Sequence, residues 1–230
     1  ELGMTNTSFL NCTGLDDAAV HYSSARDVAL MSQALISHEK IFDYTTIWMD
    51  TIRNGEFGLS NTNKLIRFYN GANGLKTGST SKAKYCLSAT ASRDGTTLIA
   101  VVLASPTSAD RFSDAKSLLD YGFANFELYT PNHLSTDRIK VEGGKSDHVL
   151  CDFRPLPFIV KKGEGKKIEM RVELAEKLSA PVERGQVIGE VRWFSGETEI
   201  AKKEVYAKTG VEKAGVFDIF LSLLGVLVGK

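Results

Sequence analysis

The stretch that decides the fold is Asn73-Gly74-Leu75-Lys76-Thr77-Gly78-Ser79-Thr80, which leads through a short turn into Tyr85–Ala91. Arg93-Asp94-Gly95 separates this run from a second apolar run, Thr97–Leu103. Two β-rich runs joined by Asp-Gly predict a hairpin. Because Thr97–Leu103 is strongly apolar, we expect it to be a central strand of the sheet.

Helices are predicted before and after this hairpin. Ser23 to Asp27 offers helix caps, with Ser23 and Asp27 as the expected capping residues. An apolar stripe follows at helical spacing: Val28, Leu30, Met31, Ala34, Leu35 and Ile36. A second stripe lies within residues 110–126: Phe112, Ala115, Leu118, Leu119 and Phe123. This second helix is expected to pack on the sheet, so residues 1–127 form an α/β domain.

Residues 128–208 have the pattern of a separate all-β domain. Four apolar residues alternate with charged ones: Ile168, Met170, Val172 and Leu174. This period of two predicts a half-buried strand. A similar alternation follows at Val187, Val191 and Trp193. Short strands separated by Gly, Pro and charged turns favour a small sandwich.

The last segment, residues 209–230, is predicted to be an amphipathic helix. Its apolar residues recur at helical spacing: Val216, Phe217, Phe220, Leu223, Leu224 and Leu227. Asp218, Ser222 and Gly225 form a narrow polar stripe. A membrane span needs about 20 apolar residues, and a charge near its centre is costly. We therefore expect residues 211–230 to lie in the plane of a membrane surface, with a core helix and a spanning helix as the alternatives.

The composition argues against several classes of function. Lys plus Arg and Asp plus Glu number 28 each, so no net charge attracts nucleic acid. The three cysteines, Cys12, Cys86 and Cys151, form no C-x-x-C pair, and the histidines form no H-x-x-x-H cluster. No zinc site is therefore predicted. The cysteines are expected to be buried free thiols.

Lys76-Thr77-Gly78-Ser79 is the motif that points to chemistry. An acyl-transfer site needs a nucleophile, a base, an oxyanion hole and groups that hold the substrate's carboxylate. Lys76 supplies positive charge, Thr77 and Ser79 supply hydroxyls, and Gly78 leaves the strand edge bare for a substrate backbone. K-T-G accompanies S-x-x-K and S-D-N in penicillin-binding proteins and class A β-lactamases. For the triplet alone, an exposed turn with no role is the alternative.

Further stretches accompany the triplet: Leu2–Phe9 with Gly14-Leu15, Tyr22–Asp27, and Asn61–Leu65. With the β-rich region and the amphipathic tail, they resemble the D-alanyl-D-alanine carboxypeptidases of the low-molecular-mass penicillin-binding class across essentially the whole chain. The resemblance implies part of a β-lactamase-like, penicillin-binding transpeptidase-like α/β domain at 1–127. A small all-β sandwich at 128–208 and the helix at 209–230 would follow it.

The other two motifs of this class are missing. Four serine–lysine pairs have the S-x-x-K spacing: Ser37/Lys40, Ser79/Lys82, Ser81/Lys84 and Ser113/Lys116. We attribute all four to chance, because in this class the serine opens a buried helix well before the K-T-G strand. S-x-N does not occur in the sequence. Both motifs are expected upstream of Glu1, and Glu1–Met4 is interpreted as the last turn of a helix, which makes the chain a fragment.

Arg111 begins the helix after the hairpin, where members of this class often carry an arginine. It is interpreted as a surface residue at a helix start. Contact with the carboxylate of a substrate is the alternative.

The resemblance implies a penicillin-sensitive serine carboxypeptidase that removes the terminal D-alanine from peptidoglycan pentapeptides through an acyl-enzyme. Lys76 would be catalytic, and Lys76, Thr77, Gly78 and Ser79 would bind substrate. β-Lactams would acylate the same serine, and no metal or organic cofactor is required. The exported protein would work at the outer face of the bacterial plasma membrane, as a peripheral protein, and this chain alone would be inactive. The alternatives are a β-lactamase and a non-catalytic cell-wall scaffolding module on the same fold.

Overall fold

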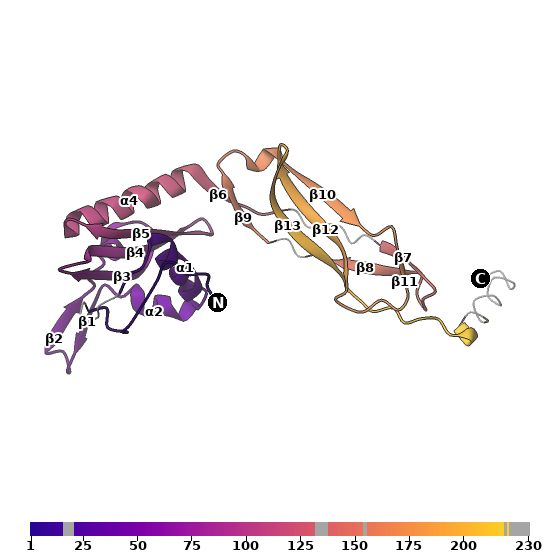
Figure 1. Ribbon diagram of the computed structural model, residues 1–230, viewed down its shortest axis with the longest axis horizontal. Helices are drawn as coiled ribbons and strands as arrows, with labels where there is room; N and C mark the ends of the chain where they lie inside the picture. The colour runs from indigo at the N-terminus through magenta and orange to yellow at the C-terminus, as the bar shows by residue number, and fades with distance from the viewer. Residues whose placement is uncertain (16–20, 132–137, 154–155, 219, 221–230) are drawn as a thin grey trace. The chain divides into compact units, whose positions relative to one another are not determined.

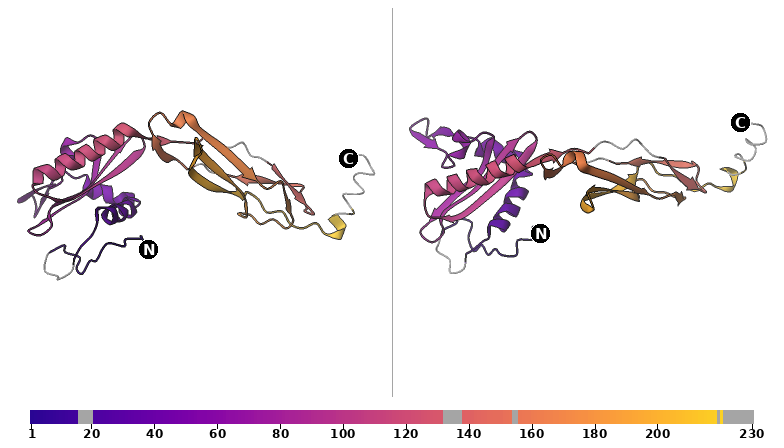
Figure 2. Two further views of the ribbon diagram at one scale, coloured as in Figure 1. Left: turned by 45° about the horizontal axis from the view of Figure 1, so that its top comes forward. Right: turned by 90° about the horizontal axis from the view of Figure 1, so that it is seen from above.

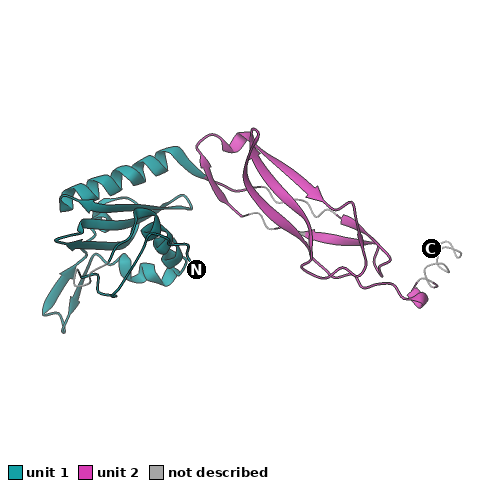
Figure 3. Ribbon diagram, in the orientation of Figure 1, with its two compact units in different colours: residues 1–127 teal, residues 128–230 magenta. Residues whose placement is uncertain are grey.

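The computed structural model describes residues 1–15, 21–131, 138–153, 156–218 and 220. The chain divides into two compact units, residues 1–127 and 128–230 (Figure 3). Each unit has a hydrophobic core of its own.

Unit 1 mixes helices and strands, as its sequence predicts (Figure 1). In chain order the elements are α1 (Ala25–Ile36), η1 (Glu39–Ile41), α2 (Phe42–Thr45), β1 (Met49–Ile52), β2 (Phe57–Ser60), α3 (Leu65–Phe68), β3 (Ala72–Thr80), β4 (Lys84–Arg93), β5 (Thr96–Ser105) and α4 (Ser108–Asn125). The predicted hairpin is β4 and β5, and both predicted helices are present as α1 and α4.

The centre of unit 1 is an antiparallel sheet in the order β3-β4-β5. Leu87 and Ala89 of β4 pack in one core with Ala115 of α4. Ser88, which points to the other face of β4, meets Ser32 of α1 with 2.7 Å between the two hydroxyl oxygens. The two helices therefore cover opposite faces of the sheet (Figure 2). Among the described strands of this sheet β4 is the central one, so Thr97–Leu103, which was predicted to be central, lies at an edge.

The helix starts differ from the prediction in detail. Ser24, not Ser23, caps α1, and its hydroxyl accepts from the Asp27 backbone N–H at 3.1 Å. Asp27 is buried, and its carboxylate accepts from the Thr7 hydroxyl at 2.7 Å. Glu1–Met4 has no regular secondary structure, so the predicted helical turn there is wrong.

The described residues of unit 2 up to Ala207 form strands and one short 3₁₀ turn. In chain order the elements are β6 (Phe126–Tyr129), which crosses the boundary between the units, β7 (Arg138–Glu142), β8 (His148–Asp152), β9 (Phe158–Lys161), η2 (Gly165–Lys167), β10 (Ile168–Leu174), β11 (Lys177–Ser179), β12 (Val187–Ser195) and β13 (Thr198–Ala207). The two strands predicted from alternating residues are β10 and β12.

The core of unit 2 lies between two layers of strands. The larger sheet has the order β10-β12-β13-β8-β7-β11, and β6 pairs with β9. Trp193 of β12 is buried, and its ring lies 5.8 Å from that of Phe153 and 5.6 Å from that of Phe158 of β9. The small ladder thus packs on one face of the large sheet, which gives the predicted β-sandwich layout.

The region after β13 contributes to this core. Val211 is only 5% exposed and pairs with Val182. Val216–Asp218 is helical, and the Asp218 carboxylate accepts from the Gly215 N–H at 2.8 Å. Leu223, Leu224 and Leu227 of the predicted tail helix lie outside the described residues. Among the residues that are described, no helix is long and apolar enough to cross a membrane.

None of the three cysteines, all of which are described, forms a disulfide. Cys151 is buried in unit 2, Cys86 is half-buried, and Cys12 is exposed. The expectation of buried thiols is therefore wrong for Cys12.

Candidate active site

The predicted site residues lie together on β3. Lys76 is exposed, and Thr77 beside it is buried. β4 is the only neighbour of β3 in this sheet among the described strands, where Thr77 pairs with Leu87 and Gly78 with Cys86. The opposite edge of β3 is therefore available for an added strand, which is how an extended peptide binds to a sheet.

Asparagine side chains hold the start of β3 in place. The amide of the buried Asn63 donates to the Gly74 carbonyl at 2.8 Å, and that of Asn61 donates to the carbonyl of Ile47 at 2.9 Å. Gly74 has no room for a side chain, since an added Cβ would lie 2.6 Å from the Thr90 hydroxyl. The Asn63 contact fixes the start of β3 relative to the loop before it, and the Asn61 contact ties that loop to the chain just before β1.

The hydroxyl of Thr77 has one specific partner on this loop. The Thr62 and Thr77 hydroxyl oxygens lie 2.6 Å apart. The ammonium group of Lys76, by contrast, donates a hydrogen bond to the Thr77 carbonyl. The structure thus orients both functional groups of the Lys-Thr pair, and nothing in the sequence indicates the role of Thr62.

Arg111 is buried below the motif, contrary to its interpretation as a surface residue. It is 7% exposed, and its Nη1 donates to the carbonyls of Gly78 at 3.2 Å and Cys86 at 3.3 Å. The guanidinium also stacks on the rings of Phe112 and Tyr85, at 4.8 and 5.5 Å. Burial lowers the pKa of Arg111, and the neighbouring side chains of Cys86 and Tyr85 act in the opposite direction.

A signal for this burial is present in the sequence. Arg111, Ala115 and Leu119 are spaced by four residues, and all three are buried on α4. Residues at this spacing share one face of a helix. Arg111 therefore belongs to the apolar stripe that packs on the sheet.

These residues border one cleft of about 530 Å³. Its lining comprises Thr13, Gly14, Leu15, Thr62, Lys76, Thr77, Gly78, Ser79, Thr80 and Arg111. Two cations and several hydroxyls line the cleft, and no carboxylate is among the lining residues. Such a surface suits an anionic group on an extended ligand.

The serine–lysine pairs do not assemble a nucleophile in this cleft. Ser37 ends α1 and donates to the Ala34 carbonyl at 2.7 Å, and Ser113 lies on an exposed part of α4. Ser81 lies on the turn between β3 and β4. Ser79 lines the cleft, but Lys82 does not. This placement is consistent with the interpretation of all four spacings as chance.

Comparisons with known proteins identify a family for each part of the chain. Residues 1–107 match the peptidase S11 family, D-alanyl-D-alanine carboxypeptidase, and residues 123–213 match the C-terminal domain of penicillin-binding protein 5. The D-alanyl-D-alanine carboxypeptidase DacF of Bacillus subtilis is 36% identical over 98% of this chain and 59% of its own length. The chain thus spans about three fifths of that relative.

Solved structures give the same result. Penicillin-binding protein 5 of Haemophilus influenzae superimposes with a TM-score of 0.80 and 31% identity, over 92% of this chain and 63% of that one. Penicillin-binding protein D2 of Listeria monocytogenes, in its cefotaxime-bound form, matches with a TM-score of 0.50 and 38% identity, over 53% of this chain and 50% of that one. Two matched families follow each other along the chain, and the relatives show the same assignment. The chain therefore belongs to the low-molecular-mass penicillin-binding D-alanyl-D-alanine carboxypeptidase family.

Proposed function

We propose that this chain supplies the K-T-G wall of a penicillin-sensitive serine D-Ala-D-Ala carboxypeptidase. The observation that carries the proposal is the placement of Lys76, Thr77 and Arg111 around one cleft at the free edge of β3. The whole protein would remove the terminal D-alanine of peptidoglycan pentapeptides through an acyl-enzyme, and β-lactams would acylate the same serine.

Five residues of the cleft have roles in this reaction. The ammonium of Lys76 stabilises negative charge that develops near the attacked carbonyl. The Thr77 and Ser79 hydroxyls bind the substrate's terminal carboxylate. Gly78 carries no side chain, so the substrate backbone can approach the strand. Arg111 holds the Gly78 carbonyl from below and adds a second positive charge, which favours an anionic ligand.

A label that reacts with the nucleophile tests this proposal. The 230-residue chain should not react with a fluorescent penicillin, since its serine–lysine pairs assemble no nucleophile in the cleft. The whole protein, which includes any residues that its gene encodes before Glu1, should bind about one label per chain. A stoichiometric label on the 230-residue chain, mapped to a serine such as Ser37 or Ser113, would contradict the assignment.

We further propose that the residues after Ala214 bind to a membrane surface, on the outer side of the bacterial plasma membrane. Val216, Phe217 and Phe220 are 88, 71 and 55% exposed. Exposed apolar side chains on a short amphipathic segment are typical of peripheral attachment. Because Val211 packs in the core of unit 2, the attachment would begin after this residue.

Two alternatives remain weaker. A β-lactamase does not account for the match of residues 123–213 to the C-terminal domain of penicillin-binding protein 5. A non-catalytic scaffold on the same fold does not require a cleft lined by two cations and several hydroxyls. The penicillin label separates the enzyme from the scaffold.

A further inference from the structure

One edge of the large sheet in unit 2 lacks most of the usual protections of a sheet edge. Among the described strands, β12 is the only neighbour of β10 (Figure 1). Free edges are normally short, bulged or interrupted by proline, or they carry charged side chains, because their N–H and C=O groups can otherwise pair with another chain. β10 has seven residues, no proline and no bulge against β12, whereas β11 at the opposite edge has only three residues. Only the charged side chains remain, so their pattern decides what can pair with β10.

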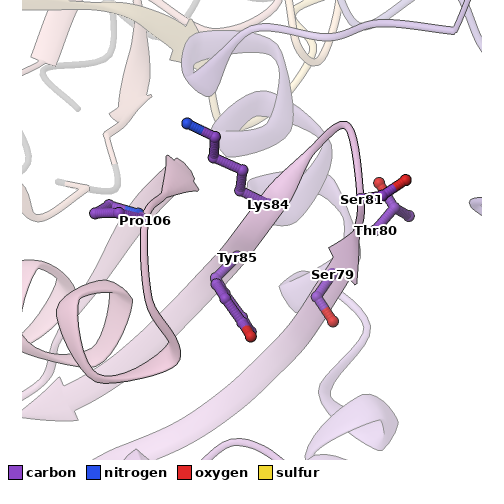
Figure 4. Close-up of a pocket in the computed structure, with 6 residues that line it drawn as sticks. All are labelled: Ser79, Thr80, Ser81, Lys84, Tyr85 and Pro106. Atoms are coloured by element: carbon purple, nitrogen blue, oxygen red, sulfur yellow. The ribbon is translucent and has the colours of Figure 1, made fainter.

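The free edge of β3 in unit 1 does not compete for the same occupant. It borders the cleft and the pocket at the end of the strand that Ser79, Lys84 and Tyr85 line (Figure 4). The residues of β10 line neither of them. The edge of β10 is therefore open to an occupant of its own.

The charges along β10 alternate in sign. Lys167 comes directly before the strand, and Glu169, Arg171 and Glu173 follow at every second position. These three alternate with the apolar residues that pack against the core, so they lie on the outer face of the sheet. The order of the signs is complementary to itself when a second copy of the strand runs antiparallel.

One register brings all of these charges into opposite pairs. With Met170 at the symmetry axis, Glu169 lies opposite Arg171 of the second copy, and Lys167 lies opposite Glu173 of the second copy. Symmetry repeats both pairs, and opposite charges at such positions stabilise a sheet. A register with Arg171 at the axis places Glu169 opposite Glu173, and like charges there are destabilising. The charges thus favour the register with Met170 at the axis.

The apolar face of β10 favours the same register. Ile168, Val172 and Leu174 are half-buried, but Met170 is 37% exposed. In this register Met170 meets Met170 of the second copy, and Ile168 meets Val172. Pairing therefore covers the one exposed apolar side chain of β10.

The charged side chains are placed to exchange partners. Arg171 Nη2 lies 3.3 Å from Glu169 Oε2, and 55 and 68% of these side chains are exposed. The Cζ atom of Arg171 lies 4.3 Å from the centroid of the Phe194 ring, which holds the guanidinium on the outer face. Glu173 lies opposite Glu190 of β12. A cation from a second copy offsets the repulsion between these two carboxylates.

We propose that β10 is a docking edge for a second copy of this chain, which adds its own β10 antiparallel with Met170 at the two-fold axis. Each β10 has one free edge, so the pairing closes at two chains. A single strand pair is a small interface, and the dimer therefore forms at high local concentration, as on a membrane surface. The pairing uses no residue of the cleft, so it is independent of the carboxypeptidase activity.

A cysteine at the axis tests the register in the whole protein. In a Cys12→Ser background, which removes the exposed thiol, Met170→Cys places the two new thiols on directly opposite residues. Their Cα atoms are about 4.5–5.5 Å apart, within reach of a disulfide. Val172→Cys is the matched control on the same face, since its two copies are about 14 Å apart along the strand. Oxidation in concentrated solution should give about tenfold more linked dimer from Met170→Cys than from Val172→Cys, because only the first pair is within bonding distance.

Charge variants of the Met170→Cys protein test the pairing itself. Arg171→Glu places like charges opposite each other twice, so the yield of linked dimer should fall roughly 3- to 20-fold, given the strength of exposed ion pairs. Adding Glu169→Arg swaps the two charges and should restore the yield. Lys202→Glu makes the same change of charge on β13, two strands from the edge, and should leave the yield unchanged. High salt should lower the yield from Met170→Cys, because it screens exposed ion pairs.

Both experiments can overturn the proposal. Absence of linked dimer, equal yields from the two cysteine variants, or a higher yield from Val172→Cys contradicts pairing at Met170. An unchanged yield in Arg171→Glu, or no recovery in the charge-swapped variant at an unchanged unfolding temperature, contradicts the pairing of these charges between chains.

Discussion

The contact between Thr62 and Thr77 gives a prediction that separates function from folding. Thr62→Val replaces a hydroxyl with a methyl group of the same shape, and Thr62→Ser keeps the hydroxyl. Thr62 is exposed, so the new methyl group creates no cavity and no steric overlap in the core. The change is therefore limited to the partner of the Thr77 hydroxyl, which lies 2.6 Å away.

The size of the effect follows from this one contact. An intramolecular hydrogen bond contributes about 0.5–1.5 kcal/mol net. Since about 1.4 kcal/mol corresponds to a tenfold change in rate, loss of the orientation of Thr77 should slow acylation by roughly two- to tenfold. Thr62→Ser should stay within about twofold of the wild type.

The assay is the second-order rate of acylation by a β-lactam, measured in the whole protein. Thr46→Val serves as the control, because the Thr46 hydroxyl donates to the Phe42 carbonyl and does not line the cleft. The control should react like the wild type. If Thr62→Val reacts at the wild-type rate, or if Thr62→Ser is slowed as much as Thr62→Val, Thr62 does not position Thr77 for the reaction.

Three further predictions use other parts of the chain. Arg111→Met should slow acylation by about 10- to 100-fold, because it removes a hydrogen bond to a charged group, which is worth about 1.5–3 kcal/mol. The fold should be retained, since methionine replaces a buried charge that is itself costly. A variant that is acylated at the wild-type rate would contradict this prediction. Burial, aided by Asp120, raises the pKa of Tyr69 to about 12, so the stabilising effect of the neutral phenol is complete below about pH 10 and is lost as the pH rises through about 12. In an ultraviolet titration Tyr69 should be the last tyrosine to ionise, and Tyr69→Phe should remove this last step; a titration without such a step would refute the prediction. The full chain should sediment with liposomes even in high salt, whereas a chain that ends at Ala214 should stay in solution. Equal sedimentation of the two chains would exclude the surface anchor.

The elements that could be predicted are those with strong local signals. The Asp94-Gly95 turn predicts the hairpin, and regular apolar spacing predicts α1, α4, β10 and β12. The order of the strands was not accessible in the same way. The apolar sequence of β5 predicts a central strand. Its apolarity comes from α1 and α4, which cover its two faces, because burial of the faces makes a strand apolar whether or not it has two neighbouring strands.

The candidate site shows the same limit. Lys76, Thr77, Gly78 and Ser79 could be found because they are adjacent in the sequence. Thr62 could not, since its contact with Thr77 depends on a loop 15 residues away. The prediction that Arg111 lies at the surface is wrong: arginine at a helix start usually faces solvent, but the spacing of Arg111 from Ala115 places it on the buried face.

The central claim, that the K-T-G strand of this chain serves an acyl-transfer site, is tested most directly at Lys76. The measurement is the rate of penicillin acylation of the whole protein, for the wild type, Lys76→Ala and the control Lys116→Ala, with thermal unfolding recorded for each. Loss of one preorganised donor typically costs on the order of 100- to 1000-fold. We expect Lys76→Ala to lose that much at an unchanged unfolding temperature, while Lys116→Ala reacts normally. A folded Lys76→Ala protein that is acylated at the wild-type rate would contradict the account.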